Sequence, residues 1–129
     1  DMAEKIYNFI FNNPNLPEDL VPYWDFDAPN IPNEPRDVSA AACTASALYE
    51  LSTYIPGKNY KETADKIMEN LGSPAYRAEV GTNGNFILMH SVGSIPHGAE
   101  IDVPLNYADY YFLEGIMRKR DLESNKKLF

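Results

Sequence analysis

Both histidines of the chain lie in one short stretch, residues 90–102, whose sequence is HSVGSIPHGAEID. Within it, His90, Ser94, His97 and Asp102 have side chains that could do chemistry. A serine beside a histidine could form a nucleophilic pair, and two histidines with a carboxylate could hold a metal ion. No nucleophile-elbow motif accompanies Ser94, and the histidine spacing matches no recognised metal-ligand pattern. The simplest expectation for His90 is a buried histidine that braces the loop, and we predict no metal or other cofactor.

A second candidate group is the run Tyr23-Trp24-Asp25-Phe26-Asp27, in which three aromatic residues are interleaved with two carboxylates. An aromatic face can stack on the apolar face of a sugar while carboxylates accept hydrogen bonds from its hydroxyls. The same run could equally be a tryptophan plug in the core, with the acids capping turns. Spacing alone does not separate these two interpretations.

Other polar residues have simpler expected roles. Asp109 lies among aromatic residues of a helical pattern, where it could be a buried acid, although such a residue more often pairs with a cation such as Arg36. Asp37 stands where it can cap the helix that follows it. Cys43 is the only cysteine, so the chain has no internal disulfide and no multi-cysteine metal site. The small neighbours of Cys43 predict a core position.

The elements that must position these residues are mainly helices. Apolar residues at helical spacing predict helices over residues 3–12, 38–54, 60–71 and 105–118. Residues 38–54 are small on every face, which predicts an interior helix, whereas residues 60–71 have a charged face and should lie outside. An inner small-residue helix followed by an outer amphipathic one is typical of helical hairpin arrays.

Loops connect these helices. Six prolines between residues 13 and 35 predict a shaped loop rather than a helix or strand. We also expect a loop over residues 90–104. The short apolar run at residues 86–89 could be an extended segment or one buried turn, because periodicity does not separate the two.

Length and charge exclude several classes of protein. The 129 residues are 44% hydrophobic and 23% charged, a balance typical of one globular unit over residues 1–129. The net charge of -8 repels phosphate backbones and anionic lipids, so we predict no nucleic-acid or membrane partner. No apolar stretch approaches the length of a membrane span, which predicts a soluble segment.

Four ordered blocks resemble the C-terminal portion of the unsaturated glucuronyl hydrolases of glycoside hydrolase family 88. The blocks are YWDFDAP at 23–29, PRDVSAAA at 35–42, HSVG at 90–93 and DVPLNYADYYFLE at 102–114. They are closer to this group than to the related unsaturated rhamnogalacturonyl hydrolases. The resemblance implies an all-α fold, a partial (α/α)6 barrel with long loops, in which residues 1–129 form a C-terminal segment of a toroid of six helical hairpins.

The resemblance also implies an activity. Enzymes of this family remove a 4,5-unsaturated uronic acid from oligosaccharides that polysaccharide lyases leave behind. An aspartic acid protonates the enol-ether double bond and positions water, so hydration of the double bond leads to hydrolysis. The paired aspartates lie in the part of the enzyme that precedes this segment. We therefore expect no catalytic residue in this chain and no turnover by the chain alone.

The expected role of this segment is substrate binding. In the family, the loop after the His-x-Val block supplies hydroxyl groups near the uronate carboxylate, and by position these places are Ser94 and His97. His97 replaces a serine seen in some members, but a histidine can also donate a hydrogen bond to an anionic sugar. The aromatic pair Tyr23 and Trp24 is expected to bind substrate as well. The residues expected to be structural near the site are His90, Arg36, Asp37, Asp102 and Asp109.

The expected partner is an unsaturated uronyl oligosaccharide, and the parent enzyme is expected in a bacterial cytoplasm or periplasm. An incomplete ring would expose inner-helix surfaces that other hairpins normally cover, so self-association is a second expectation. The alternative function is a non-catalytic, truncated helical domain that binds an oligosaccharide or a protein partner.

Overall fold

The computed structural model describes residues 2–125, which are mostly helical. The helices are α1 (Met2–Phe11), α2 (Val38–Tyr54), α3 (Tyr60–Leu71) and α4 (Asn106–Glu123). The same part of the chain also forms a short 3-10 helix, η1 (Asn83–Asn85), and two strands, β1 (Ser91–Ser94) and β2 (Ala99–Val103). Among these described residues, no helix has both the length and the apolar character needed to cross a membrane.

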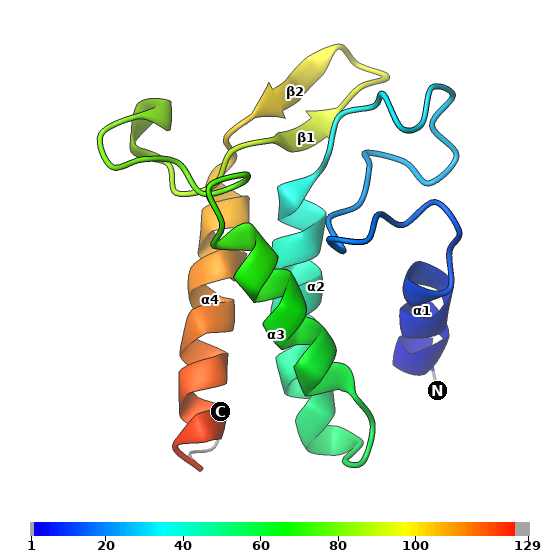
Figure 1. Ribbon diagram of the computed structural model, residues 1–129, viewed down its shortest axis with the longest axis vertical. Helices are drawn as coiled ribbons and strands as arrows, with labels where there is room; N and C mark the ends of the chain where they lie inside the picture. Colours follow the sequence, from blue (N-terminus) through cyan, green and yellow to red (C-terminus); the bar gives the residue numbers. More distant parts are fainter. Residues whose placement is uncertain (1, 126–129) are drawn as a thin grey trace.

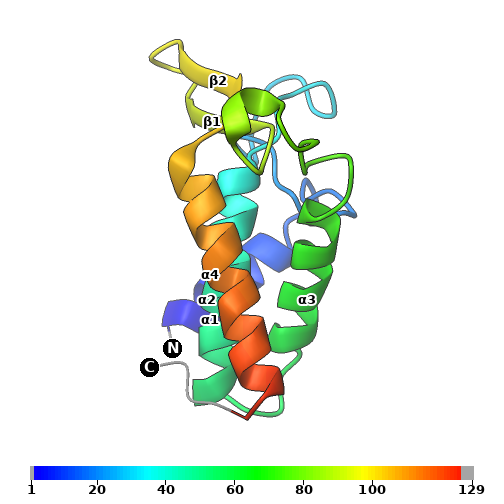
Figure 2. The same cartoon turned by 90° about the vertical axis from the view of Figure 1, so that its left-hand side faces the viewer.

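Helix α2 is the centre of the molecule. Helix α4 lies beside it and runs in the same direction, while α3 packs against α2 and runs back the opposite way (Figure 1, Figure 2). The apolar core lies where these three helices meet. Its fully buried members include Val38, Ala42, Ala45, Tyr49, Ala64, Ile67, Leu71 and Ala108.

The sequence explains why α2 can be central. Asp37 caps its first turn as predicted, because the carboxylate accepts a hydrogen bond from the backbone N–H of Ser39 at 3.0 Å. Ala41, Ala42 and Ala45 let the neighbouring helices approach closely. The expectation that Cys43 is a core residue is wrong, because within residues 2–125 it is exposed on the surface of α2.

The other helices follow their predicted patterns with small shifts. Helix α3 occupies residues 60–71 and buries its apolar stripe, as predicted. Helix α1 begins and ends one residue before the predicted range. Helix α4 begins at Asn106 and continues to Glu123, five residues beyond the predicted end. The frayed tail predicted from residue 123 onward lies partly outside the described residues.

The predicted loop at residues 90–104 is instead a β-hairpin. β1 and β2 pair antiparallel, with Ser94 opposite Ala99, Val92 opposite Ile101 and a register irregularity after Ser91. The sequence of β2, AEIDV, alternates apolar and polar residues, which is a strand signal that the expectation of a loop missed. The strand is nevertheless largely exposed. The neighbouring run at 86–89 is extended, with one isolated bridge between Leu88 and Arg77.

Candidate functional site

Ser94 and His97 meet at the tip of the hairpin. Ser94 ends β1 and His97 lies in the turn that follows, and the Ser94 Oγ and His97 Nδ1 atoms are 2.7 Å apart. Four residues of turn therefore bring the two predicted substrate-binding side chains into one hydrogen-bonded pair at the surface. Among the described residues, no carboxylate bonds the His97 ring, so the third group that orients a catalytic base is missing. The pair has the chemistry of a polar contact site for a ligand.

His90 and Asp102 form a second pair at the base of the hairpin. His90 Nδ1 lies 2.6 Å from Asp102 Oδ1, and the His90 side chain is 43% exposed. The expectation of a buried His90 is therefore wrong, because its ring lies at the surface beside the Asp102 carboxylate. The pair still joins the residue before β1 to a residue of β2, as expected of a brace.

Backbone conformation at the hairpin is unusual. His90, Glu100 and Asp102 have φ angles of 68°, 54° and 53°, in the left-handed region that favours glycine. Each such residue costs free energy, and clusters of them occur where a structure must aim side chains for function. Two of the three, His90 and Asp102, hold each other by the hydrogen bond described above.

The hairpin is attached to the start of α2. Val38 N–H donates to the His90 carbonyl at 3.1 Å, and Val92 N–H donates to Asp37 Oδ1 at 3.3 Å. The same Asp37 oxygen accepts the capping bond of α2. One carboxylate thus fixes both the first turn of an inner helix and the strand that leads to Ser94.

The Tyr23–Trp24 segment lies on the loop that enters α2. Tyr23 is only 8% exposed, and the Arg36 guanidinium lies 4.8 Å from the centre of its ring. Trp24 is half-buried and its indole N–H donates to Glu34 at 2.8 Å. Asp25 accepts a bond from the Asp27 backbone, as expected of an acid that caps a turn. Of the two aromatic rings, Trp24 is the more accessible.

Arg36 pairs with a residue that the sequence did not single out. Its guanidinium donates to Asp19 at 2.9 Å and to the Val21 carbonyl at 2.6 Å. Tyr76 also donates to Asp19. Desolvation opposes ionisation of Asp19, but the hydrogen bonds from Tyr76 and Arg36 outweigh it and hold its pKa below the ordinary value. Asp19 is distant in sequence from both partners, so no local motif could have found it.

Asp109 does not pair with Arg36, so that expectation is wrong. Its two carboxylate oxygens accept hydrogen bonds from the backbone N–H groups of Ile87 and Leu88, at 2.8 and 2.9 Å. The acid therefore ties the extended run before the hairpin to the first turn of α4.

Tyr107 and Glu100 lie at the same end of the molecule. Burial raises the pKa of the Tyr107 hydroxyl, and the nearby Glu100 and Asp37 carboxylates raise it further. The Glu100 side chain lies across Gly93, where an added Cβ would clash with it. Tyr107 belongs to a predicted helix and Glu100 to a predicted loop, so the sequence alone did not indicate that they lie close to Asp37.

The structure does not assemble a metal centre from the predicted side chains. No group of three potential ligands occurs within residues 2–125. His90 bonds Asp102 while His97 bonds Ser94. The site is thus two side-chain pairs on one hairpin, anchored to the N-terminal turn of α2.

The arrangement of the helices defines the class of protein. Two parallel inner helices, α2 and α4, with an antiparallel outer helix, α3, form part of an (α/α)6 barrel. The chain is similar to unsaturated glucuronyl hydrolases and corresponds to a C-terminal portion of them. Both the predicted resemblance and the predicted fold class are confirmed, with the hairpin as an addition to the helices. No family model matches the chain.

The matches cover most of this chain but only about a third of each relative's own length. The unsaturated glucuronyl hydrolase of Formosa agariphila is 49% identical over 120 residues, 93% of this chain and 30% of that protein. A crystal structure of an unsaturated glucuronyl hydrolase specific for heparin matches with a TM-score of 0.91 at 49% identity, over 95% of this chain and 33% of that one. A Streptococcus agalactiae unsaturated glucuronyl hydrolase variant complexed with dGlcA-GalNAc6S gives a TM-score of 0.73 at 30% identity, over 84% and 30% of the two chains.

Proposed function

We propose that this chain supplies barrel helices and part of the substrate cleft of a glycosidase that removes 4,5-unsaturated uronic acid from lyase-generated oligosaccharides. The observation that supports the proposal most directly is the 49% identity to an unsaturated glucuronyl hydrolase over 93% of the chain. The TM-score of 0.91 to the heparin-specific enzyme extends this similarity to the backbone. The proposal assigns the catalytic aspartates to the rest of the enzyme, since the chain spans only about a third of the relatives' length and supplies binding groups in this proposal.

The proposed contribution to the cleft comes from one end of the helices. The hairpin and the loop that enters α2 both lie at the end where α2 and α4 begin (Figure 1). There, Ser94 and His97 offer hydrogen-bond donors to a uronate carboxylate or a sugar hydroxyl. Trp24, and to a smaller extent the more buried Tyr23, offers aromatic surface on which a sugar can stack. The His90–Asp102 pair and Asp37 hold the hairpin in place.

The test compares the purified chain with a chimera in which it replaces the matching part of the Formosa agariphila enzyme. Each protein is mixed with a 4,5-unsaturated uronyl disaccharide, and the loss of double-bond absorbance is followed. We expect turnover by the chimera and persistent absorbance with the chain alone. Turnover by the chain alone that Asp25→Asn or Asp109→Asn abolishes would place the catalytic acid in this segment. A chimera that folds but does not turn over the disaccharide would favour the non-catalytic alternative.

The isolated chain is also proposed to self-associate through apolar faces left uncovered by an incomplete barrel. Helix α4 exposes Tyr110, Leu113, Ile116 and Met117, and contiguous apolar surface of this kind favours association. Size-exclusion chromatography with light scattering measures the mass directly. A monomer at all concentrations would contradict self-association without touching the proposed activity.

A further inference from the structure

The Glu34 carboxylate holds three hydrogen-bond donors of its own loop. Its Oε2 atom accepts a hydrogen bond from the Trp24 indole N–H at 2.8 Å. Its Oε1 atom accepts bonds from the Asn30 backbone N–H at 3.0 Å and from the Asn30 side-chain amide at 3.2 Å. The sequence patterns did not single out Glu34. In the folded chain, this residue ties the Trp24 ring to the opposite side of the loop over residues 25–34.

The contact between Trp24 and Glu34 is charge-assisted. The hydrogen bond from the Trp24 indole is the main reason that the pKa of Glu34 lies below its ordinary value. Bonds from Asn30 act in the same direction, while desolvation acts against them. Glu34 is therefore ionised at neutral pH. A hydrogen bond to an ionised acceptor is shorter and stronger than one between neutral groups, so this bond limits rotation of the indole ring.

A short backbone ladder joins this pair to the first turn of α2. The backbone N–H of Trp24 donates to the Pro35 carbonyl at 3.0 Å, and the backbone N–H of Asp37 donates to the Pro22 carbonyl at 2.9 Å. An isolated antiparallel bridge lies between these two bonds. Asp37 also accepts the bond from β1 described above. The Trp24 ring and the hairpin are therefore attached to the same helix start.

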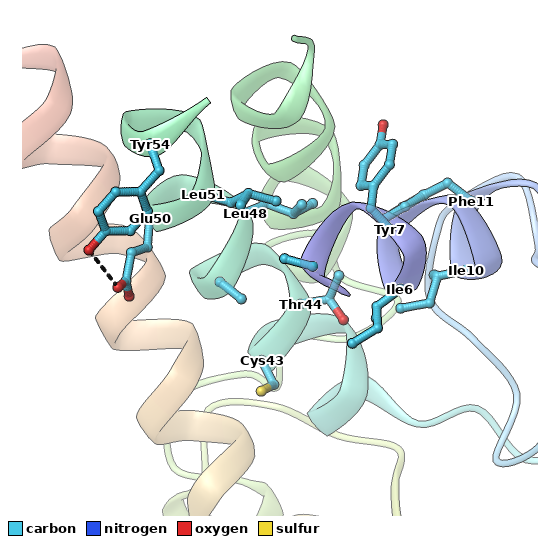
Figure 3. Close-up of a pocket in the computed structure, with 12 residues that line it drawn as sticks. Ile6, Tyr7, Ile10, Phe11, Cys43, Thr44, Leu48, Glu50, Leu51 and Tyr54 are labelled. Atoms are coloured by element: carbon cyan, nitrogen blue, oxygen red, sulfur yellow. Dashed lines mark hydrogen bonds between the residues drawn. The ribbon is translucent and has the colours of Figure 1, made fainter. Parts of the chain in front are cut away.

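The rest of the loop is held against α1. One face of α1 lines, together with α2, an apolar groove of about 540 Å³ (Figure 3), and Phe9 is not part of that lining. The rings of Phe9 and Phe26 lie 5.9 Å apart, edge to face, and the Asn15 side-chain amide donates to the Phe26 carbonyl at 2.7 Å. The loop thus has anchors that do not depend on Glu34. Removing Glu34 should free the Trp24 ring without unfolding the loop.

We propose that Glu34 is a positioning residue, whose carboxylate fixes the Trp24 indole so that its accessible surface stacks on a sugar ring of an unsaturated uronyl oligosaccharide. The inference rests on the proposed function, in which Trp24 belongs to the substrate cleft. Trp24 is half-buried and the neighbouring Asp25 is exposed, so aromatic surface and a hydrogen-bond acceptor for sugar hydroxyls lie together. Both Glu34 oxygens already accept protein hydrogen bonds, so Glu34 acts on the sugar through Trp24.

The physical advantage of such a residue is preorganisation. An aromatic side chain that is already fixed in its binding orientation loses little rotational freedom when a ligand stacks on it, so the ligand binds more tightly. This gain is present in the ground-state complex and in the transition state alike. Glu34 should therefore affect KM and leave kcat almost unchanged.

The first experiment observes the ring directly. Trp24 is the only tryptophan in the chain, so the isolated chain gives one indole N–H signal in a 1H–15N correlation spectrum. We expect Glu34→Ala to move this signal upfield and to speed its exchange with water at least about tenfold, because the acceptor is lost. Glu79→Ala, which removes an exposed acid from another loop, should leave the signal unchanged. An unchanged signal in Glu34→Ala would overturn the proposal.

The second experiment tests whether Glu34 acts through the ring. In the chimera with the Formosa agariphila enzyme, we expect Glu34→Ala to raise KM for an unsaturated uronyl disaccharide about three- to tenfold, with kcat and the melting temperature nearly constant. Trp24→Phe also removes the N–H that Glu34 holds. Adding Glu34→Ala to Trp24→Phe should therefore raise KM by less than about twofold further. Glu79→Ala should match the parent chimera.

The remaining outcomes separate this inference from a structural role and from the proposed function. A lower melting temperature of Glu34→Ala with unchanged KM would overturn the proposal, as would a full further rise in KM when Glu34→Ala is added to Trp24→Phe. A folded chimera that binds the disaccharide without turnover would remove the proposed activity, and dissociation constants of the same variants would then decide the role of Glu34. A folded chimera that does not bind the disaccharide would overturn both.

Discussion

Among single residues, Ser94 and His97 at the hairpin tip are two that we propose to contact a ligand. Ser94 and His97 form a 2.7 Å pair at the surface, and within residues 2–125 no third side chain bonds either of them to prepare it for nucleophilic attack. A hydroxyl and an imidazole presented in this way can hydrogen-bond the carboxylate or hydroxyls of a sugar. Their contribution to an enzyme would be ground-state binding.

Removing both donors tests this role in the chimera with the Formosa agariphila enzyme. We expect Ser94→Ala/His97→Ala to raise KM about 10- to 100-fold, because hydrogen bonds to charged groups contribute about 1.5–3 kcal/mol, while kcat changes little. Steady-state kinetics on an unsaturated uronyl disaccharide measures both. The matched control is Thr82→Ala, an exposed loop residue. A fall in kcat with unchanged KM would contradict a binding role.

Asp19 makes stability depend on pH. Its pKa lies below the ordinary value of 3.8 in the folded chain. The ionised carboxylate therefore stabilises the fold above the unfolded pKa, and this contribution is lost as pH falls through the folded pKa. We expect Asp19→Asn to destabilise the chain at pH 7 and to differ much less from the parent at pH 2. Urea unfolding at pH 7 and pH 2 measures the difference in unfolding free energy between Asp19→Asn and the parent. An equal difference at the two pH values would contradict the stabilising role of the Asp19 carboxylate.

At the scale of elements, Asp37 connects a helix to the hairpin. It accepts the capping bond from Ser39 N–H and a bond from Val92 N–H. The sequence predicted the cap because Asp precedes a helical pattern, but it did not predict the contact with β1, which is 55 residues away. The hairpin thereby takes its position from the most deeply packed helix.

Shortening the Asp37 side chain tests its role as a helix cap. Asp37→Ala removes both of these bonds and a third from the Ser39 hydroxyl at 2.6 Å. Loss of an N-cap alone costs about 0.5–2 kcal/mol. We expect a loss of about 2 kcal/mol in the free energy of unfolding in urea. Asp37→Asn keeps an acceptor oxygen and should lose clearly less, and Asp27→Ala, at an exposed position, should have no measurable effect. Equal effects of the alanine and asparagine changes at position 37 would contradict the capping role.

Gly93 tests how the hairpin is built. A Cβ on Gly93 would lie 2.7 Å from the Glu100 Cβ and 3.0 Å from its Cδ, so Gly93→Ala should weaken the pairing of β1 and β2. Hydrogen exchange of the Ile101 amide should accelerate, while amides of α2 and α4 keep their protection. Adding Glu100→Gly removes the obstructing side chain and suits the positive φ of that position. Protection should then return, and failure to return would contradict the proposed clash.

At the scale of the whole molecule, one polar network joins the three packed helices. Tyr49 of α2 is fully buried and donates to Asp65 of α3 at 2.7 Å. Asp65 also binds Lys61 at 2.7 Å and Lys119 of α4 at 3.1 Å. Hydrogen bonds from these partners outweigh desolvation and lower the pKa of Asp65. The network helps to fix the relative positions of inner and outer helices.

Deleting one hydroxyl measures the strength of this network. Tyr49→Phe keeps the ring but leaves Asp65 without one donor, which should cost about 1–3 kcal/mol of unfolding free energy. Tyr110→Phe is the control, because the Tyr110 side chain is exposed and its hydroxyl lies 3.5 Å from Glu114. Urea unfolding measures the free energy of unfolding of both variants. Equal values for Tyr49→Phe and Tyr110→Phe would mean that solvent replaces the Tyr49–Asp65 bond without cost.

Local patterns in the sequence were enough to predict the helices, the capping role of Asp37 and the resemblance to a portion of a glycosidase barrel. These features follow from local rules, since helical periodicity, a capping side chain and ordered motifs are properties of neighbouring residues. The expectations for Cys43, His90 and the Asp109–Arg36 pair were wrong, because they concern properties that neighbouring residues do not decide. Burial and side-chain partners depend on which distant segments pack together.

The pairing of β1 with β2, the pairing of Arg36 with Asp19 and the backbone contacts of Asp109 became visible only in the folded chain. The alternation of AEIDV at 99–103 is a local strand signal, but the partner and register of this strand are set by β1 and by the contact of Val92 with Asp37. The apolar groove that α1 and α2 line beside Cys43 likewise depends on the position of α1, which contacts α3 through Tyr7 and Tyr60. Such features depend on long-range packing, which the order of residues specifies only through the whole fold.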